Sequence, residues 1–376
     1  PLGKLGLYAC MDGVVSETPR CLALRGAEIL CNSLNSFATD EGSLHIPVRA
    51  AESRVFVVAA NKIGPLIPEA ILEPVSAATG IPIRFLSGAG DSQIVAPDGT
   101  VLALASPDKA EVIWADIDVS EARSKQRPDG TQVFAARRPE LYAAIAQDPA
   151  TQPAPSFEGA EQVSVSAVQL PGVGTGSIEA AVAATRAAVA AGARYVTLPE
   201  LFFVSQLDTQ NLAATAALSQ QVITALPAAC GNSLVALNLV EPAGKGYALV
   251  AVLLDASGVR LRQPLLHQTA RHHWSVLGNE LNTLKLGDAH VAVLSGDDAI
   301  YPEIGRLLAM RGVDLLLVPC APQEAWELRT GLVERAAENR INLVAACQPS
   351  AHGSSLICAL QKDFTVLTPW AERPYD

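Results

Sequence analysis

Two side chains in this sequence could carry covalent chemistry, and each follows a short apolar run. Residues 6–10 predict a buried strand that ends at Cys10, before a turn into a helix. A thiol there could become a nucleophile, because a helix N-terminus lowers a thiol pKa and its backbone N–H groups can receive an oxyanion. Residues 195–198 predict a second strand, and Glu200 at its tip could act as a general base.

Both residues also have an ordinary structural explanation. A cysteine at the end of a strand is most often a small buried hydrophobe. A glutamate after a strand is usually a solvated cap. Their positions after strands therefore fit a structural role as well as a catalytic one for Cys10 and Glu200. The sequence around each residue has to distinguish the two roles.

The segment that contains Cys10 occurs twice. KLGLYACMDGVVSETPR at residues 4–20 matches HVAVLSGDDAIYPEIGR at 290–306, at a constant offset of 286 positions. The same offset carries RAAESR onto RAAENR, residues 335–340. This is an internal repeat of domain length. Cys10 corresponds to Gly296, so one copy offers a nucleophile and the other does not.

The sequence around these residues resembles the carbon–nitrogen hydrolase (nitrilase) superfamily. CMDGVVSETPR is similar to that family's nucleophile motif, C-x-D-x-x-x-x-E-x-x-R, and LRGAEIL to the strand that follows it. RAAESRVFVVAANKIG, FLSGAGDSQIVAPDGTVLALA and FAARRPELY resemble the later segments in family order. VSVSAVQL and TLPELFF resemble the opening strand and the general-base segment.

The resemblance implies an α/β fold, a four-layer αββα sandwich in which Cys, Glu and Lys act together on a C–N bond. The cysteine attacks an amide, carbamoyl or nitrile carbon, the glutamate relays protons, the lysine stabilises the tetrahedral intermediate, and water releases the acyl-enzyme. On this resemblance Cys10 is the nucleophile and Glu200 occupies a general-base position. No cofactor or metal is expected, and the expected partner is a small-molecule amide or nitrile.

The second copy departs from the family pattern. No lysine occurs between Lys245 and Lys285, and Leu265 stands two residues before His267 where the family has its lysine. The nearby cations are Arg260, Arg262 and Arg271. A guanidinium is not an interchangeable replacement for an ammonium. Since Gly296 also replaces the nucleophile, we expect this copy to be a pseudoenzyme.

The repeat and the family order predict three segments. Residues 1–144 are expected to form the C-terminal half of a nitrilase-like domain that carries Cys10. Residues 145–160 are rich in Pro and Ala and are expected to be a linker. Residues 161–376 are expected to form a second, near-complete but degenerate domain. The partial first copy could pair with the second inside one chain, or sandwiches could pair between copies of the chain.

The missing front half of the first copy leaves two sources for its catalytic partners. The chain opens with Pro1 rather than Met, so we expect it to be a segment or a processing product whose own Glu and Lys lie upstream. Alternatively, Glu200 reaches the Cys10 site through a swapped pairing of half-domains. That alternative supplies no lysine, so we favour the upstream source.

Several local elements can also be predicted. Asp98-Gly99 marks a hairpin turn. A Pro-rich loop is expected at 62–85 and a strand at 112–117. Arg137 and Arg138 are expected to form structural ion pairs. The pair His272-His273 has no Glu or Cys at metal-ligand spacing, so a structural role is favoured.

The length, charge and cysteine content of the chain argue against several classes of protein. The 376 residues and 49% hydrophobic content suit a globular protein of about two domains. A net charge of −11 argues against nucleic-acid binding. No wholly apolar run approaches the ~20 residues that cross a membrane. The seven cysteines are odd in number and include no C-x-x-C, which favours reduced thiols in the cytoplasm.

Two function classes remain. The first is an enzyme that hydrolyses a non-peptide C–N bond through Cys10. The second is a non-catalytic nitrilase-like scaffold or regulatory subunit. Gly296 and the missing lysine support the second class for one copy only, whereas the intact segment around Cys10 favours the enzyme.

Overall fold

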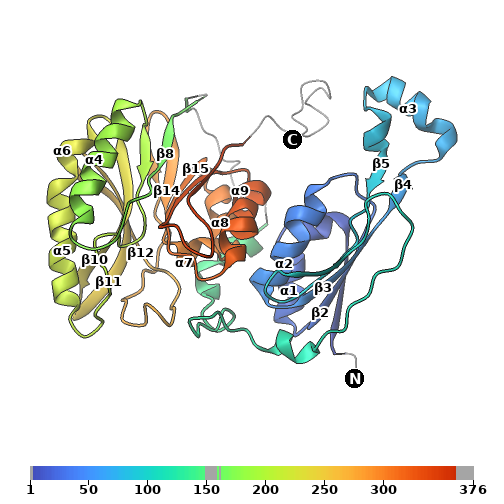
Figure 1. Cartoon of the computed structure of the whole chain (residues 1–376), viewed down its shortest axis with the longest axis horizontal. Coiled ribbons are helices and arrows are strands. Elements are labelled where there is room, and N and C mark those ends of the chain that lie inside the picture. Colours follow the sequence, from blue (N-terminus) through green and yellow to red (C-terminus); the bar gives the residue numbers. More distant parts are fainter. Residues whose placement is uncertain (1–2, 149–158, 161, 361–376) are drawn as a thin grey trace. The chain divides into compact units, whose positions relative to one another are not determined.

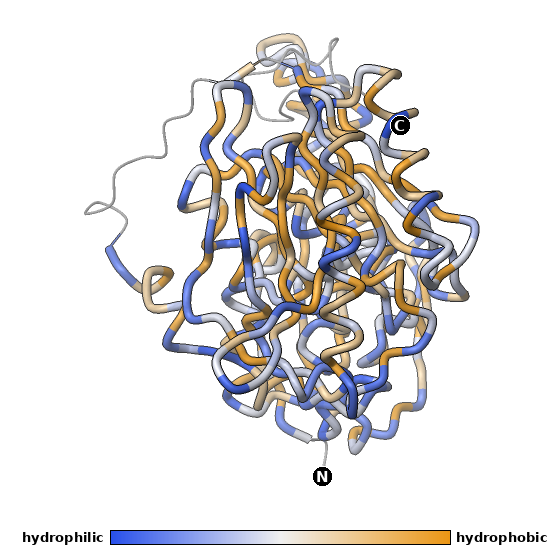
Figure 2. Tube along the Cα trace, turned by 90° about the vertical axis from the view of Figure 1, so that its left-hand side faces the viewer, coloured by the Kyte–Doolittle hydropathy of each residue, from blue (hydrophilic) through white to orange (hydrophobic). Residues whose placement is uncertain are grey.

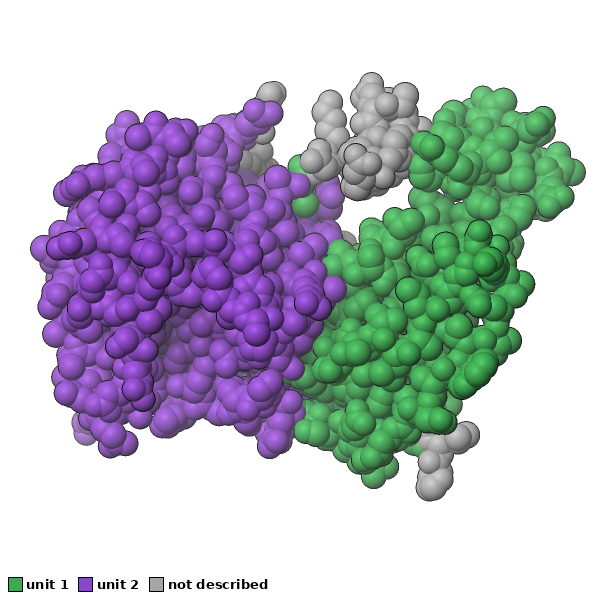
Figure 3. Space-filling model, in the orientation of Figure 1, with its two compact units in different colours: residues 1–125, 360–376 green, residues 126–359 purple. Residues whose placement is uncertain are grey.

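The computed structural model describes residues 3–148, 159–160 and 162–360 (Figure 1). The chain forms two compact units, coloured separately in Figure 3. Unit 1 comprises residues 1–125 with 360–376, and unit 2 comprises residues 126–359. Most of the predicted linker lies outside the described residues.

Unit 1 is built on a five-stranded mixed sheet of order β1-β2-β3-β6-β7. Strands β1 to β3 are parallel, and β6 and β7 pair antiparallel. The strands span Leu5–Ala9 (β1), Ile29–Leu34 (β2), Phe56–Asn61 (β3), Gln93–Val95 (β6) and Val101–Leu104 (β7). The turn between β6 and β7 contains Asp98-Gly99, which confirms the predicted hairpin.

Two helices, α1 (Glu17–Leu24) and α2 (Ile46–Ser53), cover one face of this sheet (Figure 1). Gly6 in β1 points to that face, since an added Cβ would lie 2.8 Å from Leu30 Cδ2 and 3.2 Å from Leu22 Cβ. Because side chains alternate along a strand, the residues on either side of Gly6 point to the opposite face.

Two local predictions in unit 1 were wrong. The expected loop at 62–85 contains β4 (Ile63–Pro65) and α3 (Leu72–Thr79), and β4 pairs antiparallel with β5 (Ser87–Ala89). The expected strand at 112–117 has no strand pairing. Its apolar residue Ile117 instead packs with Val119 near the core of Ile29 and Phe56, so burial rather than pairing explains the apolar pattern.

Unit 2 contains two five-stranded mixed sheets. The first has the order β12-β11-β10-β9-β8, with strands Val165–Ala167 (β8), Tyr195–Thr197 (β9), Leu234–Ala243 (β10), Gly246–Asp255 (β11) and Gly258–Pro264 (β12). The second has the order β13-β14-β15-β16-β17, with strands Leu284–Lys285 (β13), His290–Val293 (β14), Leu315–Pro319 (β15), Asn342–Ala346 (β16) and Leu356–Cys358 (β17).

The helices of unit 2 are α4 (Ser177–Ala190), α5 (Leu212–Ala225), α6 (Pro227–Cys230), α7 (Gly296–Ala299), α8 (Pro302–Met310) and α9 (Leu332–Asn339). Residues from α4 and α5, among them Ala181 and Val222, share a buried cluster with Val196 and Val235 of the first sheet. Every residue of β15, LLLVP, is buried, which is typical of a strand covered on both faces. Figure 2 marks such apolar segments in orange.

The two sheets of unit 2 bury side chains against each other. One core cluster combines Tyr195, Leu234, Ala236, Ala251 and Leu253 of the first sheet with Val291, Val293, Leu315, Leu317 and Val344 of the second. The strand ends that carry polar residues are therefore held by an apolar interface between the two sheets.

The 286-residue offset seen in the sequence also relates structural details. A π-helical turn occurs at Glu41–His45 and again at Glu327–Gly331. Arg54 and Arg340 both end a helix in the left-handed conformation, at φ +51° and +53°. The buried helix residues Arg49 and Arg335 each pair with a glutamate three positions on.

One helical stretch in the described residues, Leu212–Cys230, is long and apolar enough by composition to span a membrane. A single such stretch is weak support for a span. It comprises α5 and α6 of unit 2, and its residues Val222, Leu226 and Cys230 belong to the helix–sheet core.

Candidate functional site

Cys10 lies at the tip of β1, as the sequence predicts. It has φ +46°, a left-handed backbone that a residue with a Cβ seldom adopts, and it begins the 3₁₀ turn Cys10–Gly13. Its backbone N–H donates to Oδ1 of Asn32, in the neighbouring strand β2, at 3.1 Å. The side chain is partly exposed. The strand end and the turn together hold the thiol at the sheet edge.

Arg49 holds the turn that follows Cys10. Its side chain is fully buried, and its Nε and Nη2 donate to the carbonyl oxygens of Gly13 (2.9 Å) and Val14 (2.8 Å). Glu52 accepts from Nη1 at 2.7 Å and balances the charge. The repeated RAAESR helix therefore supports the backbone that follows Cys10.

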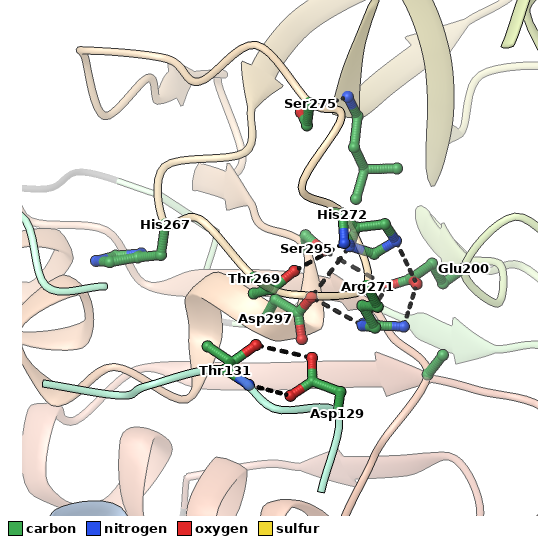
Figure 4. A network of polar contacts seen from close by, with 12 residues as sticks. Asp129, Thr131, Glu200, His267, Thr269, Arg271, His272, Ser275, Ser295 and Asp297 are labelled. Carbon is green, nitrogen blue, oxygen red and sulfur yellow. Dashed lines mark hydrogen bonds and ion pairs between the residues drawn. The ribbon is translucent and has the colours of Figure 1, made fainter. Parts of the chain in front are cut away.

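Glu200 lies in unit 2, just beyond β9, and its side chain is only 3% exposed. Both of its oxygens accept from Arg271, at 2.8 Å and 3.3 Å (Figure 4). Ser295 Oγ donates to Glu200 Oε2 at 3.5 Å. Glu200 is thus placed beside Ser295, the residue that precedes Gly296 in unit 2.

Asp297 is the centre of a buried charge network. Its carboxylate accepts from Arg271 Nε at 2.9 Å and lies 3.1 Å from His272 Nδ1 (Figure 4). Its second oxygen accepts from Arg127 Nη1 at 2.9 Å. Burial opposes the charged form of Asp297, but Arg271 and Arg127 outweigh it and hold the pKa of the carboxyl well below its usual value.

Arg127 links this network to Glu327. Its Nη2 donates to Glu327 Oε1 at 2.6 Å, and the arginine side chain is 1% exposed. Burial works against the guanidinium charge, yet the carboxylates of Asp297 and Glu327 raise its pKa above the ordinary value. A buried cation is therefore shared by two carboxylates next to Gly296 in unit 2.

Gly296 stands where the first copy has Cys10, and the space beside it is filled. A Cβ built on Gly296 would lie 2.5 Å from Cys320 Cβ, far inside contact distance. Cys320 is itself buried, and a hydrogen bond with Cys347 together with burial raises the pKa of its thiol. Unit 2 thus offers neither a nucleophile at this position nor room for one.

The three arginines near the position where the family has its lysine have different partners in the structure. Arg271 contacts Glu200 and Asp297. Arg260 and Arg262 instead form exposed ion pairs with Asp255 and Glu241. Of the three arginines that the sequence offered, Arg271 is therefore the one that joins the network around Asp297.

Residues 126–148 contact the rest of unit 2 through the side chains of Arg137, Arg138 and Tyr142. Arg137 Nε donates to Glu303 Oε1 at 2.8 Å, which confirms the predicted structural ion pairing. Arg138 donates to Leu266 O at 2.9 Å. Tyr142 Oη lies 2.5 Å from His267 Nε2, and the ring of His267 stacks on Tyr301 at 3.8 Å.

Sequence reasoning missed Arg127 and Glu327. Arg127 lies outside every motif, and its two carboxylate partners are 170 and 200 positions away in the chain. The one available signal was that Glu327 repeats Glu41 at the 286 offset. Within residues 3–148, 159–160 and 162–360, no group of three or more His, Cys, Asp or Glu side chains could hold a metal.

Comparisons with known proteins identify part of the chain. Residues 1–127 match the model of the carbon-nitrogen hydrolase family. The chain is 31% identical over 139 residues to a nitrilase of Pyrococcus abyssi, covering 37% of this chain and 46% of that protein. It is 30% identical over 148 residues to an N-carbamoylputrescine amidase of Solanum tuberosum, covering 37% and 46%. The predicted family is confirmed for this part of the chain.

These matches are limited in extent. The chain spans less than half the length of the two curated relatives. Among solved structures, an amidase from Nesterenkonia sp. is similar with a TM-score of 0.46 and 23% identity, over 54% of this chain and 81% of that one.

Proposed function

We propose that Cys10 is the nucleophile of a hydrolase that cleaves a non-peptide C–N bond in an amide, a carbamoyl compound or a nitrile. The observation that carries this proposal is the left-handed backbone of Cys10, at φ +46°, inside the segment that matches carbon-nitrogen hydrolases. Such a conformation costs about 1–3 kcal/mol, and residues that adopt it are enriched at active sites. Unlike Arg54 and Arg340, Cys10 adopts it at the end of a strand and not at the end of a helix. The nitrilase and amidase relatives support the bond type.

The proposed hydrolysis begins with nucleophilic attack of the Cys10 thiolate on the acyl carbon of the substrate. The Cys10 sulfur forms a bond to the carbonyl carbon, the C–N bond breaks, and the amine leaves with a proton, so that a thioester remains. Water then attacks the thioester, which releases the carboxylic acid and restores the thiol. With a nitrile, sulfur addition gives a thioimidate that water converts into the same thioester with loss of ammonia.

Unit 2 is, in this proposal, a non-catalytic second copy, and the whole chain is a tandem of αββα sandwiches with the first copy partial. Gly296, the filled space beside Cys320 and the Arg127–Asp297 pair support this role. Glu200 retains the general-base position, but its two oxygens bind Arg271, which favours a structural role there. A cytoplasmic location is proposed from the reduced cysteines.

The proposal is tested with Cys10→Ala and Cys21→Ala in parallel. Cys21 is an exposed cysteine on α1 and is a matched control. We expect release of ammonia or amine from a panel of short amides, carbamoyl amines and nitriles to vanish in Cys10→Ala and to persist in Cys21→Ala. Equal activity of the wild-type protein and Cys10→Ala would contradict the assignment.

A further inference from the structure

Two cysteines of unit 2 lie at paired positions on neighbouring strands. The last paired residues of β15 and β16 are Pro319 and Ala346, and the N–H of Cys320 then donates to Ala346 O at 2.9 Å. The next residues along these two parallel strands are therefore Cys320 and Cys347. Because side chains alternate along each strand, both cysteine side chains point to the same face of the sheet.

The first copy supports this pairing and shows that the repeated fold does not require thiols there. The counterparts of Cys320 and Cys347 at the 286 offset are Leu34 and Asn61. These two residues are partners in the pairing of β2 with β3. A leucine and an asparagine thus occupy the same positions in unit 1, so the two adjacent cysteines distinguish unit 2 from its repeat.

The two thiols are buried and in contact. Cys320 is 4% exposed and Cys347 is 0% exposed. A hydrogen bond joins the two thiols. Neighbouring strands lie about 4.8 Å apart, and the Cα atoms of a disulfide are usually about 4.4–6.8 Å apart. A sulfur–sulfur bond between these residues therefore needs no separation of the two strands.

We infer that Cys320 and Cys347 are a reversible dithiol–disulfide pair, a site at which a small peroxide oxidises the chain and links the ends of β15 and β16. A single buried cysteine usually packs as a small hydrophobe, but two hydrogen-bonded thiols at paired strand positions are also placed for a disulfide. In a reducing compartment such disulfides are transient and respond to oxidants. This inference does not depend on Cys10 or on hydrolysis.

The oxidation has two steps. The Cys347 thiolate attacks one oxygen of hydrogen peroxide, so that an S–O bond forms, the O–O bond breaks, and the departing hydroxide takes up the proton of the thiol to give water. The Cys320 sulfur then attacks the resulting sulfenic acid, so that the S–S bond forms and the S–O bond breaks. The hydroxide that leaves takes the Cys320 proton and becomes a second water. The two thiols lose two electrons, and the peroxide gains them.

The surroundings of Cys347 favour it as the thiol that reacts first. The hydrogen bond from Cys320 lowers the pKa of the Cys347 thiol against the effect of burial, whereas the same hydrogen bond and burial raise the pKa of Cys320. Ser355 contacts the backbone N–H and C=O of Cys347 from the loop 348–355, in which residues 349–351 are exposed. Loops open at a lower free-energy cost than core strands, which gives peroxide a route to Cys347 while the sheet stays folded.

Tryptic peptides identify the pair. Trypsin releases Cys320 in the peptide of residues 312–329 and Cys347 in the peptide of residues 341–362. The second peptide also contains Cys358, which lies in the neighbouring strand β17. Cys358→Ala is therefore a matched control for Cys347→Ala.

The test uses the 376-residue chain, which is reduced, freed of reductant and treated in the folded state with hydrogen peroxide. Catalase ends the reaction, and the chain is alkylated with N-ethylmaleimide in denaturant, digested and analysed by mass spectrometry. We expect a disulfide between the two peptides in the wild-type chain and in Cys358→Ala, and none in Cys347→Ala. In the first two proteins only, oxidation should raise the melting temperature by at least about 5 °C, because the link restricts the unfolded chain. Cys10→Ala should give the wild-type result.

Three results would overturn the inference. The first is recovery of the two peptides unlinked after peroxide treatment, whether their cysteines are alkylated or oxidised to sulfinic acid. The second is a disulfide that joins Cys320 to Cys358 or joins two chains. The third is an unchanged or lower melting temperature of the oxidised wild-type chain.

Discussion

Arg127 Nη1 lies 2.9 Å from Asp297 Oδ1, and both side chains are 1% exposed. Asp297 directly follows Gly296, the position that corresponds to Cys10. The guanidinium therefore pairs with the residue next to Gly296, and Glu327 and Arg271 complete the network. A buried ion pair of this kind is costly to break from one side, because the remaining charge stays desolvated.

Arg127→Met should destabilise unit 2 strongly. The substitution leaves the buried carboxylates of Asp297 and Glu327 without their shared cation, and we expect a loss of about 3–5 kcal/mol in the free energy of unfolding. Urea denaturation followed by intrinsic fluorescence measures it. The control is Arg260→Met, which removes an exposed pair with Asp255 and should change stability by less than about 1 kcal/mol. Similar losses in both variants would contradict the role of Arg127.

Gly296→Cys should not create a second active site. Its Cβ would overlap Cys320 Cβ at 2.5 Å, so we expect a destabilisation of about 1–3 kcal/mol from overpacking. Adding Cys320→Gly should relieve part of that loss, because it removes the opposing carbon. The measurement is the melting temperature of the two variants, together with amide hydrolysis in a Cys10→Ala background. Hydrolysis that appears in this background only with Gly296→Cys would show that unit 2 retains catalytic capacity.

Asp314 should make the chain less stable as pH rises. Burial raises the pKa of this carboxyl from its ordinary 3.8 to about 6, and the negative charge of Asp288 adds to the shift. The folded state then holds the proton more tightly than the unfolded state, so stability falls between about pH 4 and pH 6 and stays lower above that window.

Asp314→Asn removes this penalty and keeps an oxygen acceptor for the His290 N–H. Because Asp314 is only partly buried, we expect a gain on the order of 1 kcal/mol at pH 7 and little difference near pH 4. Denaturation at a series of pH values measures the difference. Asp288→Asn should instead lower the stability at pH 7. Burial tends to raise the pKa of Asp288, but Arg194 outweighs burial and lowers it, so the charged carboxylate stabilises the folded state.

The strand ends at Cys10 and Glu200 could be predicted from local sequence. The apolar runs before Cys10 and Glu200 predicted strands, and β1 and β9 end within a few residues of them. Short-range apolar patterns suffice for this because a buried strand needs only a few consecutive apolar residues. The structural pairing of Arg137 was also predicted and is confirmed by Glu303.

The long-range contacts could not be predicted in the same way. Arg127 and Asp297 are 170 positions apart in the sequence and come together only in the folded chain. A local pattern of apolar and polar residues contains no information about such a pair. The strand expected at 112–117 failed for a related reason, because Ile117 is apolar for packing and not for strand pairing. The offset of 286 was more informative, since the structure places π-helical turns at Glu41–His45 and Glu327–Gly331, which are related by the same offset.

The most direct test of the central claim is to trap the acyl-enzyme. The chain is incubated with short amides, carbamoyl amines and nitriles, quenched in acid and digested with trypsin, which cleaves after Lys4 and Arg20. The peptide of residues 5–20 is then analysed by mass spectrometry, with the peptide that contains Cys21 as internal control. We predict a mass increase equal to the acyl group on Cys10 only. An acyl adduct on another cysteine, or substrate turnover with Cys10 replaced by alanine, would contradict the assignment of Cys10 as the nucleophile.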